Sequence, residues 1–332
     1  MSNVSCLMTN VSLTPMPTSH AIKNRDFVAL ARLISGIENE DEQALQNADE
    51  LSLEPKYSRV LGITGLPGAG KSTLVNQLIK LMVKEDKTVA VLAIDPTSPF
   101  TGGAVLGDRI RFLNTDETDG KVFFRSMASR GHHGGLSNST ADILQVFNAA
   151  QFDYVIIETV GAGQLEVDIA YLTDTLVNVL TPEAGDDIQA IKAGIMEIGD
   201  IFVINKSDLP GADRKLSQLQ SMLDDVKPKS SREKTWEIPV LKTQAEQGCG
   251  IDELLKRIKE HATTTRTDRD TTRIGQHLKD LLEQGFQLKA LNILGPSWVD
   301  EQAKKIQAHL LTPRQAIQQA FDLIFSQPKD QP

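Results

Sequence analysis

Short apolar runs recur along the central part of the chain, and longer stretches with a helical pattern separate them. In Leu74–Val83 and Ile188–Ile198, apolar residues return at the spacings typical of amphipathic helices. Alternation of short buried strands with such helices predicts an α/β fold, in which helices cover both faces of a mostly parallel sheet. The runs expected to form strands are Val60–Ile63, Val89–Ile94, Val122–Phe124, Tyr154–Ile157, Leu176–Leu180, Ile201–Ile204 and Val240–Leu241.

The N-terminal part of the chain lies outside this alternation. Residues 1–25 are rich in Ser, Thr, Asn and Pro, and they carry neither the apolar segment of a signal peptide nor the Arg-rich pattern of a mitochondrial presequence. We therefore expect a disordered tail and a cytoplasmic protein. Residues 26–55 predict an N-terminal helical arm, in which apolar residues from Phe27 to Ile37 share one face.

The C-terminal part of the chain also carries helical patterns. Residues 56–262 hold the alternating pattern and form the main domain, and residues 263–332 predict a C-terminal helical extension. The last helix is well signalled, because Thr312 can cap it and Pro313 suits its first position. Its apolar stripe needs a surface to bury against, either its own domain or a second copy of the chain. The apolar pattern by itself leaves both of these surfaces open.

The composition is that of an ordinary globular protein, since 40% of the 332 residues are hydrophobic and 24% are charged. No apolar run approaches the ~18 to 20 residues that cross a bilayer, so we expect no membrane partner. A net charge of −9 argues against a protein whose task is to hold a nucleic-acid backbone. The two cysteines, Cys6 and Cys249, cannot form a disulfide framework or a Cys-rich zinc site, which fits a reducing compartment.

The segment Gly65–Ser72 matches the phosphate-binding loop of P-loop NTPases and lies between an expected strand and an expected helix. Its glycines let backbone N–H groups turn towards phosphates, Lys71 would contact the β- and γ-phosphate oxygens, and Ser72 would offer its hydroxyl to magnesium. The alternative is a chance glycine-rich turn, which the flanking elements disfavour. The residues expected to hold the phosphates are Gly65, Pro67, Gly68, Ala69, Gly70, Lys71, Ser72 and Thr73.

A second motif, Asn205-Lys206-Ser207-Asp208, follows the expected strand Ile201–Ile204. The carboxyl ends of parallel strands are where open α/β sheets bind ligands. Asp208 can accept hydrogen bonds from the ring N–H and the exocyclic amine of guanine, whereas adenine has no such pair of donors on that edge. The alternative is an ordinary polar turn. The residues expected at the base are Asn205, Lys206 and Asp208, with Thr243, Gln244 and Ala245 at a second guanine-contacting position.

Two carboxylates stand at the ends of expected strands. Asp95 and Glu158 each follow directly on an apolar run, where a carboxylate is well placed to hold magnesium directly or through water. Either of them alone could instead cap a turn. Asp108, in a glycine-rich charged stretch, is a further magnesium candidate, and Gly161 could offer its backbone N–H to the γ-phosphate.

Longer blocks of sequence surround these residues, at 65–73, 91–109, 124–132, 158–168 and 185–200. Together they resemble the GTPase chaperones that accompany adenosylcobalamin-dependent methylmalonyl-CoA mutase, which are SIMIBI-class P-loop GTPases. The block at 91–109 reads Val-Leu-Ala-Ile-Asp-Pro-Thr-Ser-Pro-Phe-Thr-Gly-Gly-Ala-Val-Leu-Gly-Asp-Arg, and the block at 158–168 reads Glu-Thr-Val-Gly-Ala-Gly-Gln-Leu-Glu-Val-Asp. The resemblance covers the chain from about residue 26 to residue 260.

This resemblance implies a homodimer that uses the C-terminal helical extension, residues 263–332. It also implies that the partner of this homodimer is an adenosylcobalamin-dependent acyl-CoA mutase. It implies that the loops around Gln164 and Asp186–Lys192 relay the nucleotide state to that mutase. It also implies a magnesium ion whose direct or indirect ligands are Ser72, Asp95, Asp108 and Glu158.

We therefore predict slow, magnesium-dependent GTP hydrolysis that is coupled to loading, protection or reactivation of such a mutase. The phosphate loop and Lys71 would stabilise charge on the γ-phosphoryl oxygens, with Glu158 beside the magnesium ion. No general base is evident, so Gln164 or Glu166 is expected to orient the attacking water.

Three alternatives stay open at this point. A nickel-insertion GTPase should show a Cys-Pro-His or His-rich metal site, which this sequence lacks. In a P-loop kinase or transport-linked ATPase, Asp208 would be an ordinary turn residue. A binding module that does not hydrolyse nucleotide would never release phosphate.

Overall fold

The computed structural model describes residues 17–53, 55, 57–95, 120–128, 135–159, 169–183, 198–226 and 236–264, together with 275, 278–279, 282–283, 285–287 and 289–325. The chain divides into two compact units, Met1–Asp270 and Thr271–Pro332.

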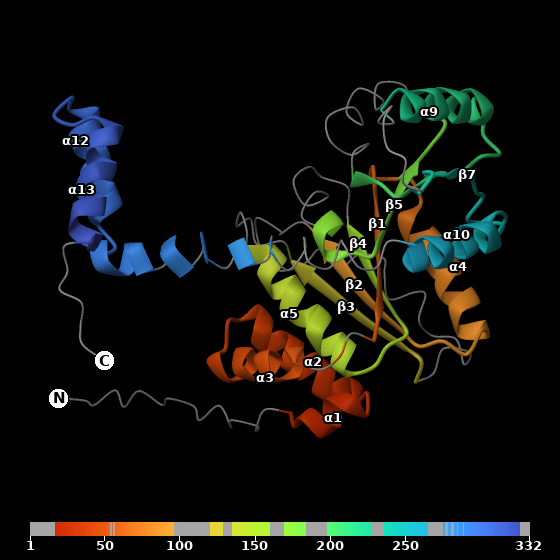
Figure 1. Ribbon diagram of the computed structural model, residues 1–332, viewed down its shortest axis with the longest axis horizontal. Helices are drawn as coiled ribbons and strands as arrows, with labels where there is room; N and C mark the ends of the chain where they lie inside the picture. Colours follow the sequence, from red (N-terminus) through yellow and green to blue (C-terminus); the bar gives the residue numbers. More distant parts are fainter. Residues whose placement is uncertain are drawn as a thin grey trace, which may run out of the picture. The chain divides into compact units, whose positions relative to one another are not determined.

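The first unit is built on a sheet of seven strands, in the order β3-β2-β4-β1-β5-β6-β7 (Figure 1). Every neighbouring pair of these strands is parallel. The predicted α/β fold with a parallel sheet is thereby confirmed, and each expected apolar run forms a strand. The strands are β1 Arg59–Gly65, β2 Val89–Asp95, β3 Val122–Ala128, β4 Tyr154–Thr159, β5 Thr175–Leu180, β6 Ile201–Ile204 and β7 Val240–Lys242.

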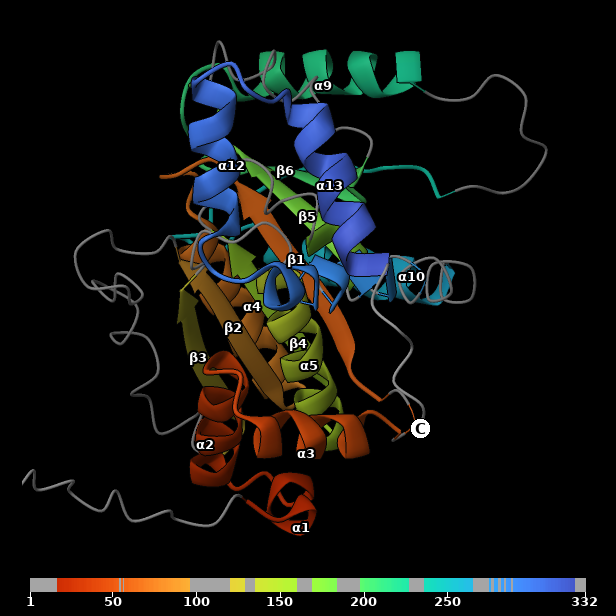
Figure 2. The same ribbon diagram turned by 90° about the vertical axis from the view of Figure 1, so that its left-hand side faces the viewer.

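Helices cover both faces of the sheet, as the views in Figures 1 and 2 show. On one face, α4 (Lys71–Lys84) and α10 (Ile251–Thr264) bury apolar residues of the central strands. On the other face, α5 (Gly135–Ala149) packs on the half of the sheet that ends in β3, and α9 (Ala212–Val226) packs on Leu180 and the half that ends in β7. Strands buried on both faces explain why the runs are continuously apolar.

The N-terminal arm completes the core on the α5 side and consists of α1 (Ser19–Lys23), α2 (Phe27–Glu38) and α3 (Glu42–Ser52). Asp26 and Asp41 cap the second and third of these helices with their carboxylates. Helix α1 lies within the stretch for which we expected no ordered structure. It forms because Thr18 accepts a hydrogen bond from the Ala21 N–H at 3.3 Å and because Ile22 is fully buried.

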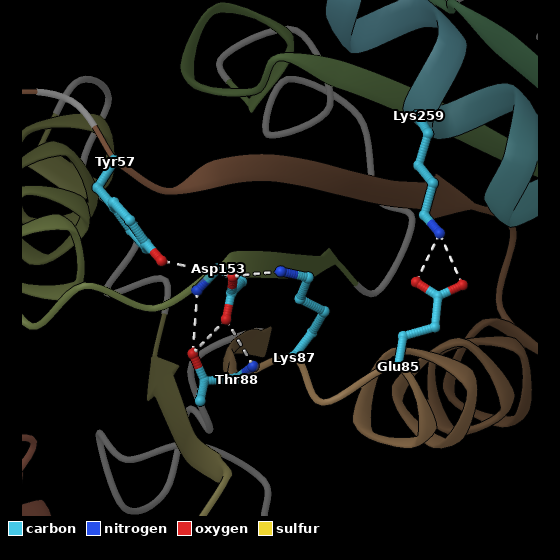
Figure 3. A network of polar contacts seen from close by, with 6 residues as sticks. All are labelled: Tyr57, Glu85, Lys87, Thr88, Asp153 and Lys259. Atoms are coloured by element: carbon cyan, nitrogen blue, oxygen red, sulfur yellow. Dashed lines mark hydrogen bonds and ion pairs between the residues drawn. The ribbon is translucent and has the colours of Figure 1, made fainter.

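Asp153 links the amino end of β4 to the amino end of β2 (Figure 3). The amino ends of the strands lie opposite the phosphate loop, which follows the carboxyl end of β1. Asp153 Oδ2 accepts hydrogen bonds from the N–H and the hydroxyl of Thr88, both at 2.9 Å, and its Oδ1 pairs with Lys87 at 3.1 Å. Burial acts to raise the pKa of Asp153, but these hydrogen bonds outweigh it and the pKa is lowered. In the same view, Lys259 of α10 contacts both carboxylate oxygens of Glu85 beside α4, at 2.6 and 2.7 Å.

The second unit contains α12 (Trp298–Gln307) and α13 (Pro313–Phe325). Thr312 and Gln315 form the expected cap of α13, because the Gln315 N–H donates to the Thr312 hydroxyl and the Gln315 amide oxygen accepts from the Thr312 N–H. Several large apolar side chains of this unit are exposed, among them Leu282, Phe286, Ile317, Phe321 and Phe325. Within the described residues, none of the helices has the length and apolarity needed to span a membrane.

Asp142 places a carboxylate in the region where α5 packs against α3. Burial and, secondarily, the negative charge of Asp49 in α3 raise the pKa of Asp142 from 3.8 to about 6. An acid whose folded-state pKa is raised destabilises the fold when it is ionised. This penalty is therefore fully present above about pH 6 and disappears as the pH falls towards 4.

We expect Asp142→Asn to raise the free energy of unfolding by about 1–2 kcal/mol near neutral pH, with a smaller gain at about pH 5. Urea denaturation at the two pH values measures both quantities. Asp49→Asn is the matched control, and it should stabilise less because the charge of Asp49 is the lesser cause of the shift. Equal stability of Asp142→Asn and the unaltered protein near neutral pH would show that ionised Asp142 does not destabilise the fold.

Candidate functional site

The phosphate loop joins the carboxyl end of β1 to the start of α4, in the middle of the sheet. Three of its glycines lie in the left-handed region, Gly65 at φ +132°, Gly68 at φ +77° and Gly70 at φ +86°. A Cβ atom on Gly65 would lie 2.0 Å from the carbonyl oxygen of Val179, and one on Gly70 would lie 2.3 Å from Asn205 Nδ2. Only glycine fits these two positions, so the loop lies tightly against β5 and the residue that follows β6.

Lys71 is the first residue of α4 and is only 7% exposed. Its Nζ donates hydrogen bonds to the carbonyl oxygens of Gly65 at 2.6 Å and Leu66 at 2.9 Å. The ammonium group therefore lies against the phosphate loop, which directly precedes α4. A positive charge held at this point can neutralise phosphate oxygens that bind to the loop.

Ser72 and Glu158 meet beside the loop, where the Ser72 hydroxyl donates to Glu158 Oε1 at 2.5 Å. Glu158 is 2% exposed and pairs in register with Ile63 of β1, which sets its carboxylate next to the first turn of α4. A hydroxyl and a carboxylate are the oxygen donors that magnesium prefers. The two side chains therefore fit a magnesium ion at this point.

Asp95 is the last residue of β2, the strand beside β4, and its neighbour Ile94 pairs with Thr159. Asp95 and Glu158 therefore lie at the carboxyl ends of two adjacent strands, β2 and β4. In the described part of the chain, no three His, Cys, Asp or Glu side chains gather in a way that could hold a metal ion. Magnesium does not require such a cage, because it keeps several waters and uses phosphate oxygens as ligands.

Asn205 connects the phosphate loop to the loop after β7. Its Nδ2 donates to the Ala69 carbonyl at 2.9 Å, and its Oδ1 accepts from the Thr243 hydroxyl and the Ala245 N–H, both at 3.0 Å. The side chain is 2% exposed, so these bonds are shielded from water. The sequence predicts Asn205 as a nucleotide contact, but it does not reveal that one amide joins the two loops.

The loops after β6 and β7 lie side by side, because the Ser207 N–H donates to the Thr243 carbonyl at 3.0 Å. Lys206 adopts φ +55°, an uncommon backbone conformation for a residue other than glycine, and Asp208 is exposed. Gln244 exchanges backbone hydrogen bonds with Cys249, which closes the second loop on itself. The structure therefore brings both predicted base-contacting segments together at the carboxyl edge of the sheet.

Four of the predicted site residues, Asp108, Gly161, Gln164 and Glu166, lie outside the described residues, as does the predicted relay loop Asp186–Lys192. Of Asp95 only the backbone is described. The remaining predicted residues gather at the carboxyl ends of β1, β4, β6 and β7 and in the first turn of α4. A parallel sheet with a phosphate loop between its central strand and the following helix defines the P-loop NTPase class.

The sequence model of the family described as methylmalonyl-CoA mutase-associated GTPase MeaB matches residues 30–288, and the chain belongs to this family. A Pyrococcus abyssi protein named as a GTPase is 50% identical over 240 residues, which cover 72% of this chain and 74% of that protein. A mouse protein, named methylmalonic aciduria type A homolog, mitochondrial, is 32% identical over 252 residues, or 75% of this chain and 58% of the mouse protein. The crystal structure of a LAO/AO transport system kinase is 25% identical, with a TM-score of 0.69, and the match covers 92% of this chain and 96% of that one.

Membership of this family makes the protein a GTPase. It also disfavours the open alternatives of a P-loop kinase and of a module that binds nucleotide without hydrolysing it.

Proposed function

We propose that the protein hydrolyses GTP in a magnesium-dependent reaction and that it uses this reaction to chaperone an adenosylcobalamin-dependent acyl-CoA mutase, methylmalonyl-CoA mutase in the first instance. The chaperoning would consist of cofactor loading, protection or reactivation. The main structural support for nucleotide binding is the side-chain amide of Asn205. It joins the phosphate loop to the loop after β7, which is expected to contact the base.

The phosphate loop and Lys71 supply the charge stabilisation in this proposal. Backbone N–H groups of the phosphate loop, from residues other than Pro67, bind the phosphate oxygens, and the ammonium of Lys71 exchanges its bonds to the Gly65 and Leu66 carbonyls for bonds to the β- and γ-phosphates. The donors are aligned before the reaction, so little reorganisation is needed as charge develops on the γ-phosphoryl group. Gln164 orients the attacking water.

Ser72 and Glu158 are the side chains that would hold magnesium, together with Asp95 and Asp108. Their hydrogen bond at 2.5 Å supports this assignment, because it brings a hydroxyl and a carboxylate to one point beside the phosphate loop. When bound, magnesium supplies positive charge against the β- and γ-phosphate oxygens.

Asp208 gives the site its preference for guanine. Its carboxylate accepts hydrogen bonds from the ring N–H and the exocyclic amine, while Lys206 and the segment Thr243, Gln244 and Ala245 line the base. The exposure of Asp208 at the carboxyl edge of the sheet supports this role, since the carboxylate is accessible to a base.

The mutase partner rests on the family and on the name of the mouse relative. We propose that the loops around Gln164 and Asp186–Lys192 transmit the nucleotide state to the mutase. A partner can read that state only if it binds the GTP-bound and GDP-bound forms with different affinities.

A binding experiment tests this part of the proposal. The immobilised protein, loaded with either a non-hydrolysable GTP analogue or GDP, is titrated with purified methylmalonyl-CoA mutase. We expect the two dissociation constants to differ at least about fivefold, the lower end of usual coupling between sites. Equal affinities, or no binding in either state, would refute the chaperone function and leave the GTPase assignment intact.

We also propose that the C-terminal extension supports a homodimer. The exposed apolar side chains of that unit, such as Ile317, Phe321 and Phe325, support this because they require a covering surface. Light scattering of the whole protein should then give twice the chain mass of 36.4 kDa. A mass of one chain at every concentration would exclude the dimer.

A further inference from the structure

Arg125 is a charged residue in the apolar run of β3, the edge strand of the sheet. It lies on the same face as Phe123 and Met127, both of which are buried in the core beneath the N-terminal arm. Its guanidinium forms an ion pair with Glu38 and donates a hydrogen bond to the Ser35 hydroxyl at 3.0 Å. Both partners belong to the last turns of α2, so the arm holds β3 through this arginine.

The contact is shielded from water, because the side chain of Arg125 is 26% exposed and that of Glu38 is 13% exposed. A charged pair in such surroundings is weakly screened and fixes geometry more firmly than an exposed pair. At the other end of α2, the rings of Phe27 and Phe123 pack edge to face at 5.3 Å between centroids. Helix α2 is therefore attached to β3 at two points, one apolar and one ionic.

The register of the sheet connects this contact to the nucleotide site. Arg125 pairs with Leu92 of β2, and three residues further along Ala128 pairs with Asp95. The carboxyl end of β2, which carries Asp95, therefore lies between the carboxyl half of β3 and β4. A shift of β3 would move this strand end, because neighbouring strands are joined by the ladder of backbone hydrogen bonds.

We propose that Ser35 and Glu38 are positioning residues for the magnesium end of the nucleotide site. They act through Arg125, which holds the carboxyl half of β3, and through the pairing of β3 with β2 up to Asp95. The inference rests on the proposed magnesium-dependent GTPase function. It adds that the N-terminal arm takes part in setting the affinity for magnesium, besides completing the core.

The test measures how well magnesium retains bound nucleotide, which does not depend on hydrolysis. The protein is loaded with a fluorescent GDP analogue, and the release rate of the analogue is followed over a range of free magnesium concentrations. Removal of groups that orient metal ligands commonly weakens metal binding by about 10- to 100-fold. Because Glu38 acts one step further away, we expect Glu38→Gln to raise the half-maximal magnesium concentration about three- to tenfold, and Ser35→Ala about twofold.

The ion pair between Lys121 and Asp86 offers a matched control. It lies at the amino end of β3, joins it to the turn before β2 at 2.7 Å, and is exposed. Asp86→Asn should therefore leave the magnesium dependence unchanged. Arg125→Lys serves as a second variant, because lysine keeps the positive charge but lacks the branched guanidinium group that contacts Ser35 and Glu38 at the same time. It should shift the magnesium dependence in the same direction as Glu38→Gln.

A merely structural role would lower the melting temperature of Glu38→Gln and Arg125→Lys without changing the magnesium dependence of release. That result would overturn the inference and leave the proposed function standing. If the unaltered protein retains the analogue equally well with and without magnesium, the magnesium part of the proposed function fails, and the inference fails with it.

Discussion

Asp208→Asn is expected to change the preference of the protein from guanine to xanthine nucleotides. The carboxylate of Asp208 accepts from two donors of guanine, whereas an asparagine amide presents a donor opposite the exocyclic amine. Xanthine carries a carbonyl oxygen at that position and restores a matched pair of hydrogen bonds. Hydrogen bonds to a charged group contribute about 1.5–3 kcal/mol, so we expect the affinity for GTP to fall roughly 100-fold and that for XTP to rise.

Competition of GTP, XTP and ATP against a fluorescent GDP analogue measures this change. Asp213→Asn is the matched control, since Asp213 is an exposed aspartate at the start of the neighbouring helix α9, ion-paired with Lys242 at 2.7 Å. The control should keep the preference for GTP. If Asp208→Asn binds GTP and XTP as the unaltered protein does, Asp208 does not contact the base.

Lys71→Ala is expected to reduce kcat/KM for GTP by about 100- to 1,000-fold, the usual loss when one preorganised charge-stabilising donor is removed. Lys71 is buried against the loop carbonyls, so it is held ready for phosphate oxygens. The loss should appear in the rate of hydrolysis as well as in binding, because charge on the γ-phosphoryl oxygens changes during the reaction.

Lys84→Ala provides the comparison for this variant. Lys84 is the last residue of α4, lies at the other end of the same helix and is exposed. Phosphate release should be normal in Lys84→Ala and nearly lost in Lys71→Ala, while both variants keep the circular dichroism of the folded protein. A Lys71→Ala protein that hydrolyses GTP within threefold of the normal rate would remove Lys71 from the mechanism.

The sheet and the phosphate loop could be predicted because their signals are local. Each strand is a continuous apolar run, and the loop has a fixed spacing of glycine, lysine and serine between a strand and a helix. The cap of α13 is equally local, since Thr312 and Gln315 are three residues apart. Such features need no knowledge of what the rest of the chain does.

The connections within the site could not be predicted in the same way. Asn205 and Ala69 are separated by 136 positions, and Arg125 and Glu38 by 87, so only the folded chain brings them together. In the sequence, Arg125 is a charge that interrupts an apolar run, and nothing nearby names its partner. Helix α1 was missed for a related reason, because the burial of Ile22 depends on helices that follow later in the chain.

The proposed coupling between the GTPase site and the mutase can be measured as the rate of GTP hydrolysis, first with the purified protein alone and then with an excess of methylmalonyl-CoA mutase. We expect slow turnover by the protein alone, because the site positions GTP without an evident general base, and an increase of at least about tenfold when the mutase binds. A high rate that the mutase leaves unchanged would exclude this coupling.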